Sequence, residues 1–368
     1  MIELGAYVDS KRIFYYDVLR SLAIILVILS HISKQFALTR PIGSLGWSLA
    51  VSFQDVAVMG VPIFLMISGA LLLNRDYELR DFLKRRFSRI LIPFVFWAIL
   101  YPFMFMACFN TPWSLAEYVH IVIEKEYWFV WMLIGAYLLM PFINSFIKEY
   151  DIEGLGYALI LWFVFMIVLK DLKIDFFTQL VSYHSLGWTE IFAGYFGYFI
   201  LGYYLSVKKF RLSDRQMYLI GLAMLVVFTV INIRYTIVQS QQANVLVYYG
   251  YRRIVSTLQA VGLFLFVMYF SRYCENNIGN VRNRIFSFFR DTRMSTVILS
   301  VSVCSYGMFL THYFIVYPLL WISKNITPVY SLSSVYVPVV LICVVFLSWL
   351  ITFVFSKIPI LKYFSGAY

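Results

Sequence analysis

The sequence predicts an all-α fold: a polytopic integral membrane protein with about ten transmembrane helices and both termini in the cytoplasm. The first observation is composition, since 62% of the 368 residues are hydrophobic and only 13% are charged. Average soluble domains contain roughly 45–50% apolar and about 25% charged residues. A soluble protein could not bury this much apolar surface, which excludes the two or three soluble domains that the length alone would suggest.

The second observation is the recurrence of apolar stretches along the whole chain. A membrane-spanning helix needs about 20 mainly apolar residues. No hydrophilic stretch is long enough for a soluble domain, so residues 1–368 are predicted to form a single membrane domain without an appended soluble one. Ten segments qualify as spans: 13–33, 51–73, 90–109, 127–147, 154–170, 190–207, 216–234, 252–271, 295–321 and 335–356.

The third observation is the distribution of positive charge. The chain has 30 Lys and Arg against 19 Asp and Glu, a net charge of +11. With the N-terminus inside, 20 of these cations fall in inner segments and 9 in outer segments. Cytoplasmic loops of membrane proteins collect Lys and Arg, so this bias predicts cytoplasmic termini and needs no nucleic-acid partner. The Phe and Arg spacing within 272–294 predicts an amphipathic helix at the inner membrane surface.

Cysteine usage argues against metal and redox chemistry. Cys108, Cys274, Cys304 and Cys343 are scattered and form no CxxC pair. Such a pattern favours neither a metal centre nor a disulfide framework. No metal is therefore expected.

The first predicted helix holds three ionisable residues, Asp17, Arg20 and His31. Ionisable groups within a membrane span are costly and are a functional hypothesis by default. Arg20 and His31 lie eleven residues apart, which returns them to within about 20° of one helix face, separated by roughly 16 Å along the axis. Asp17 is close enough to Arg20 to pair with it. The alternative is an arginine that extends to the inner surface and a histidine that forms hydrogen bonds at the outer one.

A second basic element, FLKRRFSRILIP (82–93), lies just inside the membrane. Arg86 and Arg89 are three residues apart and share a helix face, and Arg85 lies next to them. Guanidinium groups bind phosphate through paired hydrogen bonds, so the element is a candidate phosphate site. The general excess of cations at the inner surface is the alternative explanation.

These elements, taken with four further motifs, resemble the acyltransferase 3 family of membrane acyltransferases. The first match is an arginine and a histidine separated by ten residues, and the others follow over nearly the whole chain in the same order. The matching segments are DVLRSLAIILVILSH (17–31), GVPIFLMISGALLL (60–73), FLKRRFSRILIP (82–93), YWFVWMLIGAYLLMP (127–141), GYFGYFILGYYL (194–205) and SYGMFLTHYFIV (305–316).

The resemblance implies transfer of an acyl group, most commonly acetyl, from acyl-CoA to a hydroxyl of a cell-surface polysaccharide or lipid-linked glycan. It implies that acetyl-CoA or another acyl-CoA is the donor, and that the protein resides in the bacterial inner membrane. His31 corresponds to the essential histidine and Arg20 to its motif partner, with Asp17 beside it. Arg86 and Arg89, with the neighbouring Arg85, correspond to the donor-binding element. His31 could act as a general base or as a covalent acyl carrier.

Other functions and other residues remain open at this stage. A transporter or flippase for a lipid-linked glycan would also have about ten helices with buried Arg and His, although no inverted repeat is found. A purely structural subunit would leave the Arg20–His31 stripe unexplained. Secondary candidates, each with a simpler packing or interfacial explanation, are Glu190, His312, Ser68, Tyr306, Arg252 and Arg253.

Overall fold

A computed structural model of the chain describes residues 13–75, 78–109, 114–122, 127–172, 187–245, 253–276, 293–326 and 333–367. Every regular element in these ranges is a helix, which confirms the predicted all-α class for this part of the chain. The predicted amphipathic helix within 272–294 falls mostly on residues 277–292, which lie outside the described residues.

The long helices are α1 (Phe14–Leu38), α4 (Leu79–Phe109), α6 (Trp128–Trp162), α9 (Gly187–Val207), α10 (Asp214–Ala243), α11 (Ile254–Asn276), α13 (Arg293–Thr311) and α15 (Ser333–Lys357). The shorter ones are α2 (Leu45–Ala57), α3 (Gly60–Leu72), α5 (Leu115–His120), the π-helix η2 (Phe163–Val168), α7 (Leu169–Asp171), α14 (Tyr313–Ile326) and the 3₁₀-helix η4 (Leu361–Phe364).

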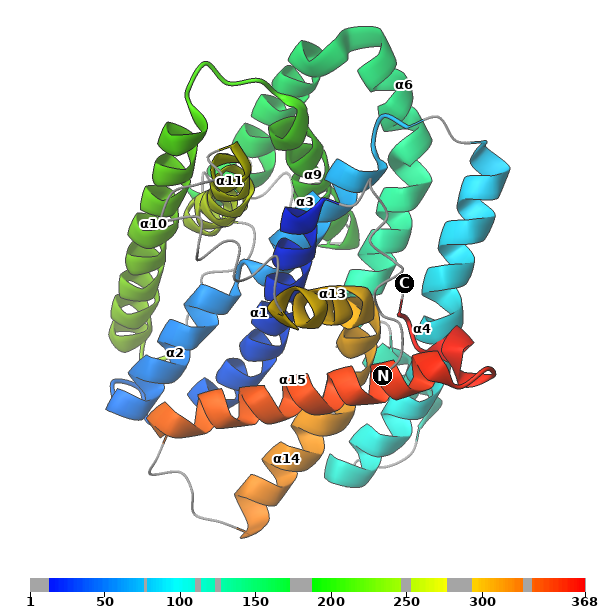
Figure 1. Ribbon diagram of the computed structural model, residues 1–368. Helices are drawn as coiled ribbons and strands as arrows, with labels where there is room; N and C mark the ends of the chain where they lie inside the picture. The colour runs from blue at the N-terminus through cyan, green and yellow to red at the C-terminus, as the bar shows by residue number, and fades with distance from the viewer. Residues whose placement is uncertain are drawn as a thin grey trace.

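The described residues contain eight helical stretches that are long and apolar enough to cross a membrane, so the predicted count of ten is not confirmed. The predicted spans 127–147 and 154–170 both overlap one stretch, Trp128–Val168. Its helix is interrupted by the left-handed backbone of Asp151 (φ 54°), and in Figure 1 the ribbon of α6 bends over at its far end. The span predicted over 190–207 is α9, which is not among the eight.

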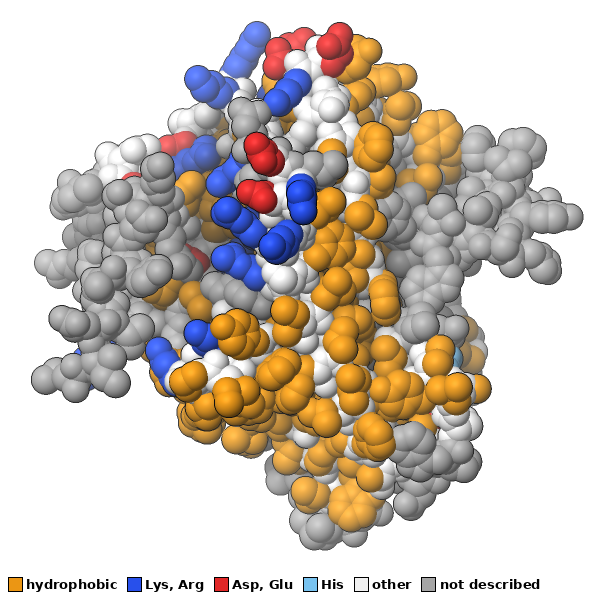
Figure 2. Space-filling view, turned by 90° about the vertical axis from the view of Figure 1, so that its right-hand side faces the viewer, with side chains coloured by type: hydrophobic (Ala, Val, Ile, Leu, Met, Phe, Trp, Pro, Cys, Tyr) orange, Lys and Arg blue, Asp and Glu red, His pale blue; other side chains and the backbone are white. Residues whose placement is uncertain are grey.

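The surface of the molecule fits a bilayer. Figure 2 shows a broad field of exposed hydrophobic side chains, with Lys and Arg gathered toward one end of it. Exposed Ile92, Val95, Ile99 and Phe103 extend along one side of α4. A soluble monomer rarely exposes so continuous an apolar surface, whereas lipid tails cover it without cost. The chain is an integral membrane protein.

Helix α1 lies at the centre of the arrangement (Figure 1), where it packs against α2, α3, α11, α13 and α15. Its side chains Leu19, Ala23, Ile24 and Ile28 are fully buried. Asp17, Arg20 and His31 face other helices of the protein, which is the expected placement for such groups inside a membrane, whereas Lys34 near the end of α1 is exposed.

The motifs at 60–73 and 194–205 pack directly against each other, a contact that the sequence alone did not predict. A Cβ added to Gly69 of α3 would lie 1.7 Å from the carbonyl oxygen of Phe199 on α9. A Cβ added to Gly202 of α9 would lie 1.9 Å from the carbonyl oxygen of Met66 on α3. Small residues that allow two backbones to approach are the usual basis of helix association in lipid. This contact fixes α3 beside the core.

The break between α2 and α3 is buried, and side chains form hydrogen bonds to a backbone carbonyl beside it. The carbonyl oxygen of Asp55, near the end of α2, accepts hydrogen bonds from Nδ2 of Asn232 at 3.3 Å and from Nε2 of Gln259 at 3.0 Å. These amides belong to α10 and α11. Unpaired backbone carbonyls are costly in a membrane interior, so the two amides allow the helix to be interrupted there.

Candidate functional site

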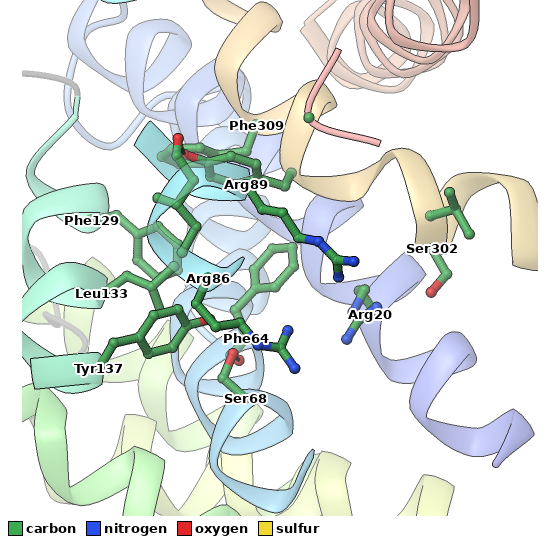
Figure 3. A pocket seen from close by; sticks show the side chains of 14 residues that line it. Arg20, Phe64, Ser68, Arg86, Arg89, Phe129, Leu133, Tyr137, Ser302 and Phe309 are labelled. Atoms are coloured by element: carbon green, nitrogen blue, oxygen red, sulfur yellow. Dashed lines mark hydrogen bonds between the residues drawn. The ribbon is translucent and has the colours of Figure 1, made fainter. Parts of the chain in front are cut away.

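A cavity of about 150 Å³ lies between α1, α3, α4, α6, α13 and the C-terminal segment (Figure 3). It brings together five of the six motifs named above. Its polar side chains come from α1, α3, α4, α6 and α13, and its apolar side chains from α3, α4, α6 and α13. The lining residues are Arg20, Phe64, Ser68, Arg86, Arg89, Ile90, Phe129, Leu133, Tyr137, Ser302, Val303, Tyr306, Phe309 and Gly366.

Three arginines predicted from separate sequence elements line this one cavity. Arg86 and Arg89 enter from α4 and Arg20 from α1, and Figure 3 shows their guanidinium ends pointing into a common space. Arg20 and Arg86 are half-buried, and Arg89 is exposed. Three positive charges around a small, partly enclosed cavity create a potential that favours a polyanionic ligand.

Arg85 is not among the residues that line the cavity. One helix position is a rotation of about 100°, which turns its side chain away from Arg86. Its side chain is 77% exposed and lies 3.8 Å from the carboxylate of Asp81, one turn earlier on α4. Among the described residues, no carboxylate forms an ion pair with Arg86. The structure therefore separates the two adjacent arginines, which the sequence had grouped together.

Asp17 lies at the edge of this site and has a partner that the sequence did not predict. The hydroxyl of Ser302, on α13, donates a hydrogen bond of 2.6 Å to its carboxylate. Asp17 is buried, and Ser302 lines the cavity. A charged hydrogen bond of this length in a buried place is strong, so it ties α13 to α1 beside Arg20.

The remainder of the cavity is aromatic. The ring of Phe129 lies 6.1 Å from that of Phe64 and 5.2 Å from that of Phe309. Tyr306 lies nearby, and its hydroxyl donates to the carbonyl of Ile90 at 3.0 Å, which links α13 to α4. Ser68 instead donates within its own helix, to the carbonyl of Phe64 at 2.8 Å.

His31 does not line the cavity but belongs to a separate aromatic cluster. Helix α1 is continuous from Phe14 to Leu38, so the predicted offset of roughly 16 Å between Arg20 and His31 follows from its rise. The hydroxyl oxygen of Tyr313 lies 3.0 Å from Nε2 and 3.3 Å from Nδ1 of His31. The ring of His312 lies 5.2 Å from the His31 ring. His31 itself is half-buried.

Phe309 connects the cavity with this cluster. Its ring lines the cavity and lies 5.9 Å from the ring of His312. Its carbonyl oxygen accepts a hydrogen bond of 2.6 Å from Nδ1 of His312. Phe309 therefore contacts both the cavity and the histidine cluster.

Several secondary predictions are changed by the structure. Arg253, one of the secondary candidates, forms a close ion pair with Asp171. Arg252 and the side chain of Glu190 lie outside the described residues. Tyr313 and Phe309 were missed, because a tyrosine or phenylalanine in an apolar helix gives no signal in the sequence that separates a site residue from a packing one.

Comparison with known proteins identifies the family of the chain. A search of curated proteins and a search of solved structures gave no significant match. The family model of the acyltransferase 3 family, described as an acyltransferase domain, matches residues 13–353. This range includes every arginine and histidine of the site. The chain therefore belongs to the acyltransferase 3 family of membrane acyltransferases.

Proposed function

We propose that this protein transfers an acyl group, most commonly acetyl, from acyl-CoA to a hydroxyl of a cell-envelope glycan in the bacterial inner membrane. The observation that carries the proposal is the cavity with three arginines at one side and aromatic rings at the other. Coenzyme A has the same two-part character, with a polyanionic head and a long, narrow pantetheine arm.

The arginines supply the part of the site that would hold the head group. Arg86 and Arg89, on α4, and Arg20, on α1, line the cavity and would bind the phosphates. Hydrogen bonds between guanidinium and phosphate are charge-assisted and geometrically specific. The cations exposed near the start of α4, Arg80, Lys84 and Arg85, favour a cytoplasmic position for this end, where acyl-CoA is found and where both termini would lie.

His31 would supply the chemistry at the far end of the arm. The roughly 16 Å between Arg20 and His31 is comparable to an extended pantetheine arm. As a general base, a neutral imidazole takes the proton of the acceptor hydroxyl while the hydroxyl oxygen attacks the thioester carbonyl. The carbon–sulfur bond then breaks, and the departing thiolate receives that proton. As a nucleophile, the imidazole would first carry the acyl group itself and release the thiolate.

The test uses purified protein in liposomes with acetyl-CoA and a hydroxyl-bearing glycan acceptor. CoA release is measured for wild type, His31→Ala and the matched control His120→Ala, which alters a histidine of α5 that does not line the cavity. Loss of a general base costs about 10²- to 10⁴-fold in rate, so His31→Ala should lose nearly all turnover and the control should keep it. Near-normal turnover of His31→Ala would sink the proposal. Movement of a lipid-linked glycan across the bilayer without CoA release would favour a transporter.

A further inference from the structure

The span predicted over 295–321 is interrupted at His312, and this interruption shapes the histidine cluster. Helix α13 ends at Thr311 and α14 begins at Tyr313. In a continuous helix two adjacent residues point about 100° apart and do not face one neighbour together. Here the rings of His312 and Tyr313 both lie against His31, with ring centroids at 5.2 and 4.8 Å.

The two adjacent residues have different partners in the cluster. Nδ1 of His312 is bonded to the carbonyl oxygen of Phe309, and a carbonyl can only accept, so this nitrogen carries the proton. The ring of His312 thus caps the C-terminal end of α13 with a hydrogen bond to one of its last carbonyls, as basic side chains often do. Tyr313 directs its hydroxyl to His31 instead. Of these two adjacent residues, Tyr313 is therefore the one whose side chain forms a hydrogen bond with the imidazole of His31.

Tyr313 is held firmly in this orientation. Its side chain is 1% exposed, and its ring stacks on Tyr317 at 5.8 Å and lies 5.5 Å from Tyr101. Its hydroxyl lies closer to Nε2 of His31, at 3.0 Å, than to Nδ1, at 3.3 Å. When the Tyr313 oxygen accepts the hydrogen of Nε2, that nitrogen is the protonated one, and Nδ1 keeps the lone pair that a base or a nucleophile needs.

We propose that Tyr313 is a positioning residue that orients the His31 imidazole and selects the tautomer in which it reacts. The proposal rests on the proposed function, in which His31 performs the chemistry. The helix break at His312 is the structural reason that Tyr313 can reach it from α14. The donor cavity does not include Tyr313, so donor binding and His31 orientation are separate properties of the protein.

The experiment compares Tyr313→Phe with Tyr317→Phe, which removes a hydroxyl from the neighbouring stacked ring one turn along α14. Tyr313→Phe should lower kcat by about tenfold, the effect of one hydrogen bond that acts in the reaction, and leave KM for acetyl-CoA unchanged. Tyr317→Phe should change neither constant. Equal kcat values for Tyr313→Phe and wild type, or a rise in KM with unchanged kcat, would overturn the proposal.

A second measurement reads the tautomer in the wild-type protein itself. The ¹⁵N NMR spectrum of wild-type protein labelled in its four histidines, with His31 assigned by His31→Ala, reports the tautomer of that ring. One dominant tautomer is expected, and an even mixture of the two would contradict the role of Tyr313. If His31→Ala is inactive while Tyr313→Phe is fully active, the positioning role is wrong and the proposed function stands. If His31→Ala is active, the proposed function itself fails.

Discussion

The adjacent residues Arg85 and Arg86 provide the sharpest test of the donor site. They have the same chemistry and lie on the same helix, yet only Arg86 lines the cavity. We expect Arg86→Gln to weaken CoA binding strongly and Arg85→Gln to leave it almost unchanged. Glutamine keeps a polar side chain of similar length and a good helix propensity, so neither change should disturb α4 itself.

The expected size follows from the surroundings of each side chain. A hydrogen bond to a charged group contributes about 1.5–3 kcal/mol, and each 1.4 kcal/mol is about tenfold in Kd. Arg86 is half-buried, so losing one guanidinium–phosphate contact there should raise the Kd of CoA about 10- to 100-fold. Within the described part of the chain, Arg85 forms an exposed pair with Asp81, and such pairs are worth about 0–1 kcal/mol. Its replacement should change the Kd by less than about threefold.

The assay is calorimetric titration of CoA into purified protein in nanodiscs, at two salt concentrations. Wild-type binding should weaken at high salt, because charge interactions at a partly open cavity are screened. This salt dependence should be smaller in Arg86→Gln than in Arg85→Gln. If the two variants lose affinity equally, the cavity is not the phosphate site and the cations near the start of α4 act only as a general positive surface.

Three further outcomes are expected. Gly69→Ala places a methyl group 1.7 Å from a backbone carbonyl of α9 and should destabilise the protein by about 1–3 kcal/mol or more, measured as a lower Tm. The control Gly156→Ala places its methyl group 3.3 Å from a ring atom and should destabilise the protein far less. Equal Tm values for the two variants would disprove the tight packing of α3 on α9. Ser302→Ala removes a donor from the buried carboxylate of Asp17 and should cost about 1–3 kcal/mol, with non-additive Tm changes when it is combined with Asp17→Asn. Phe309→Ala removes a ring that lies on both the cavity and His312, and it should raise kcat/KM for butyryl-CoA relative to acetyl-CoA. An unchanged ratio would show that Phe309 does not limit the acyl chain.

The sequence by itself determined the membrane class and the local geometry of its motifs. Hydropathy and charge are properties of composition and order, and helix periodicity fixes which residues share a face. The common face of Arg86 and Arg89 and the stripe from Arg20 to His31 follow from this periodicity alone, and the structure keeps both on continuous helices. The count of spans was less certain, because a helix such as α6 can turn at one residue, Asp151, without a polar loop.

Only the tertiary structure decided which of these faces meet. Tyr313 reaches His31 across 282 positions of sequence, and Ser302 reaches Asp17 across 285. Periodicity describes one helix at a time, whereas the pairing of helices depends on close backbone contacts such as those at Gly69 and on breaks such as the one at His312. That long-range packing brought Arg20 to Arg86, left Arg85 outside the cavity and placed an unpredicted tyrosine beside the predicted histidine.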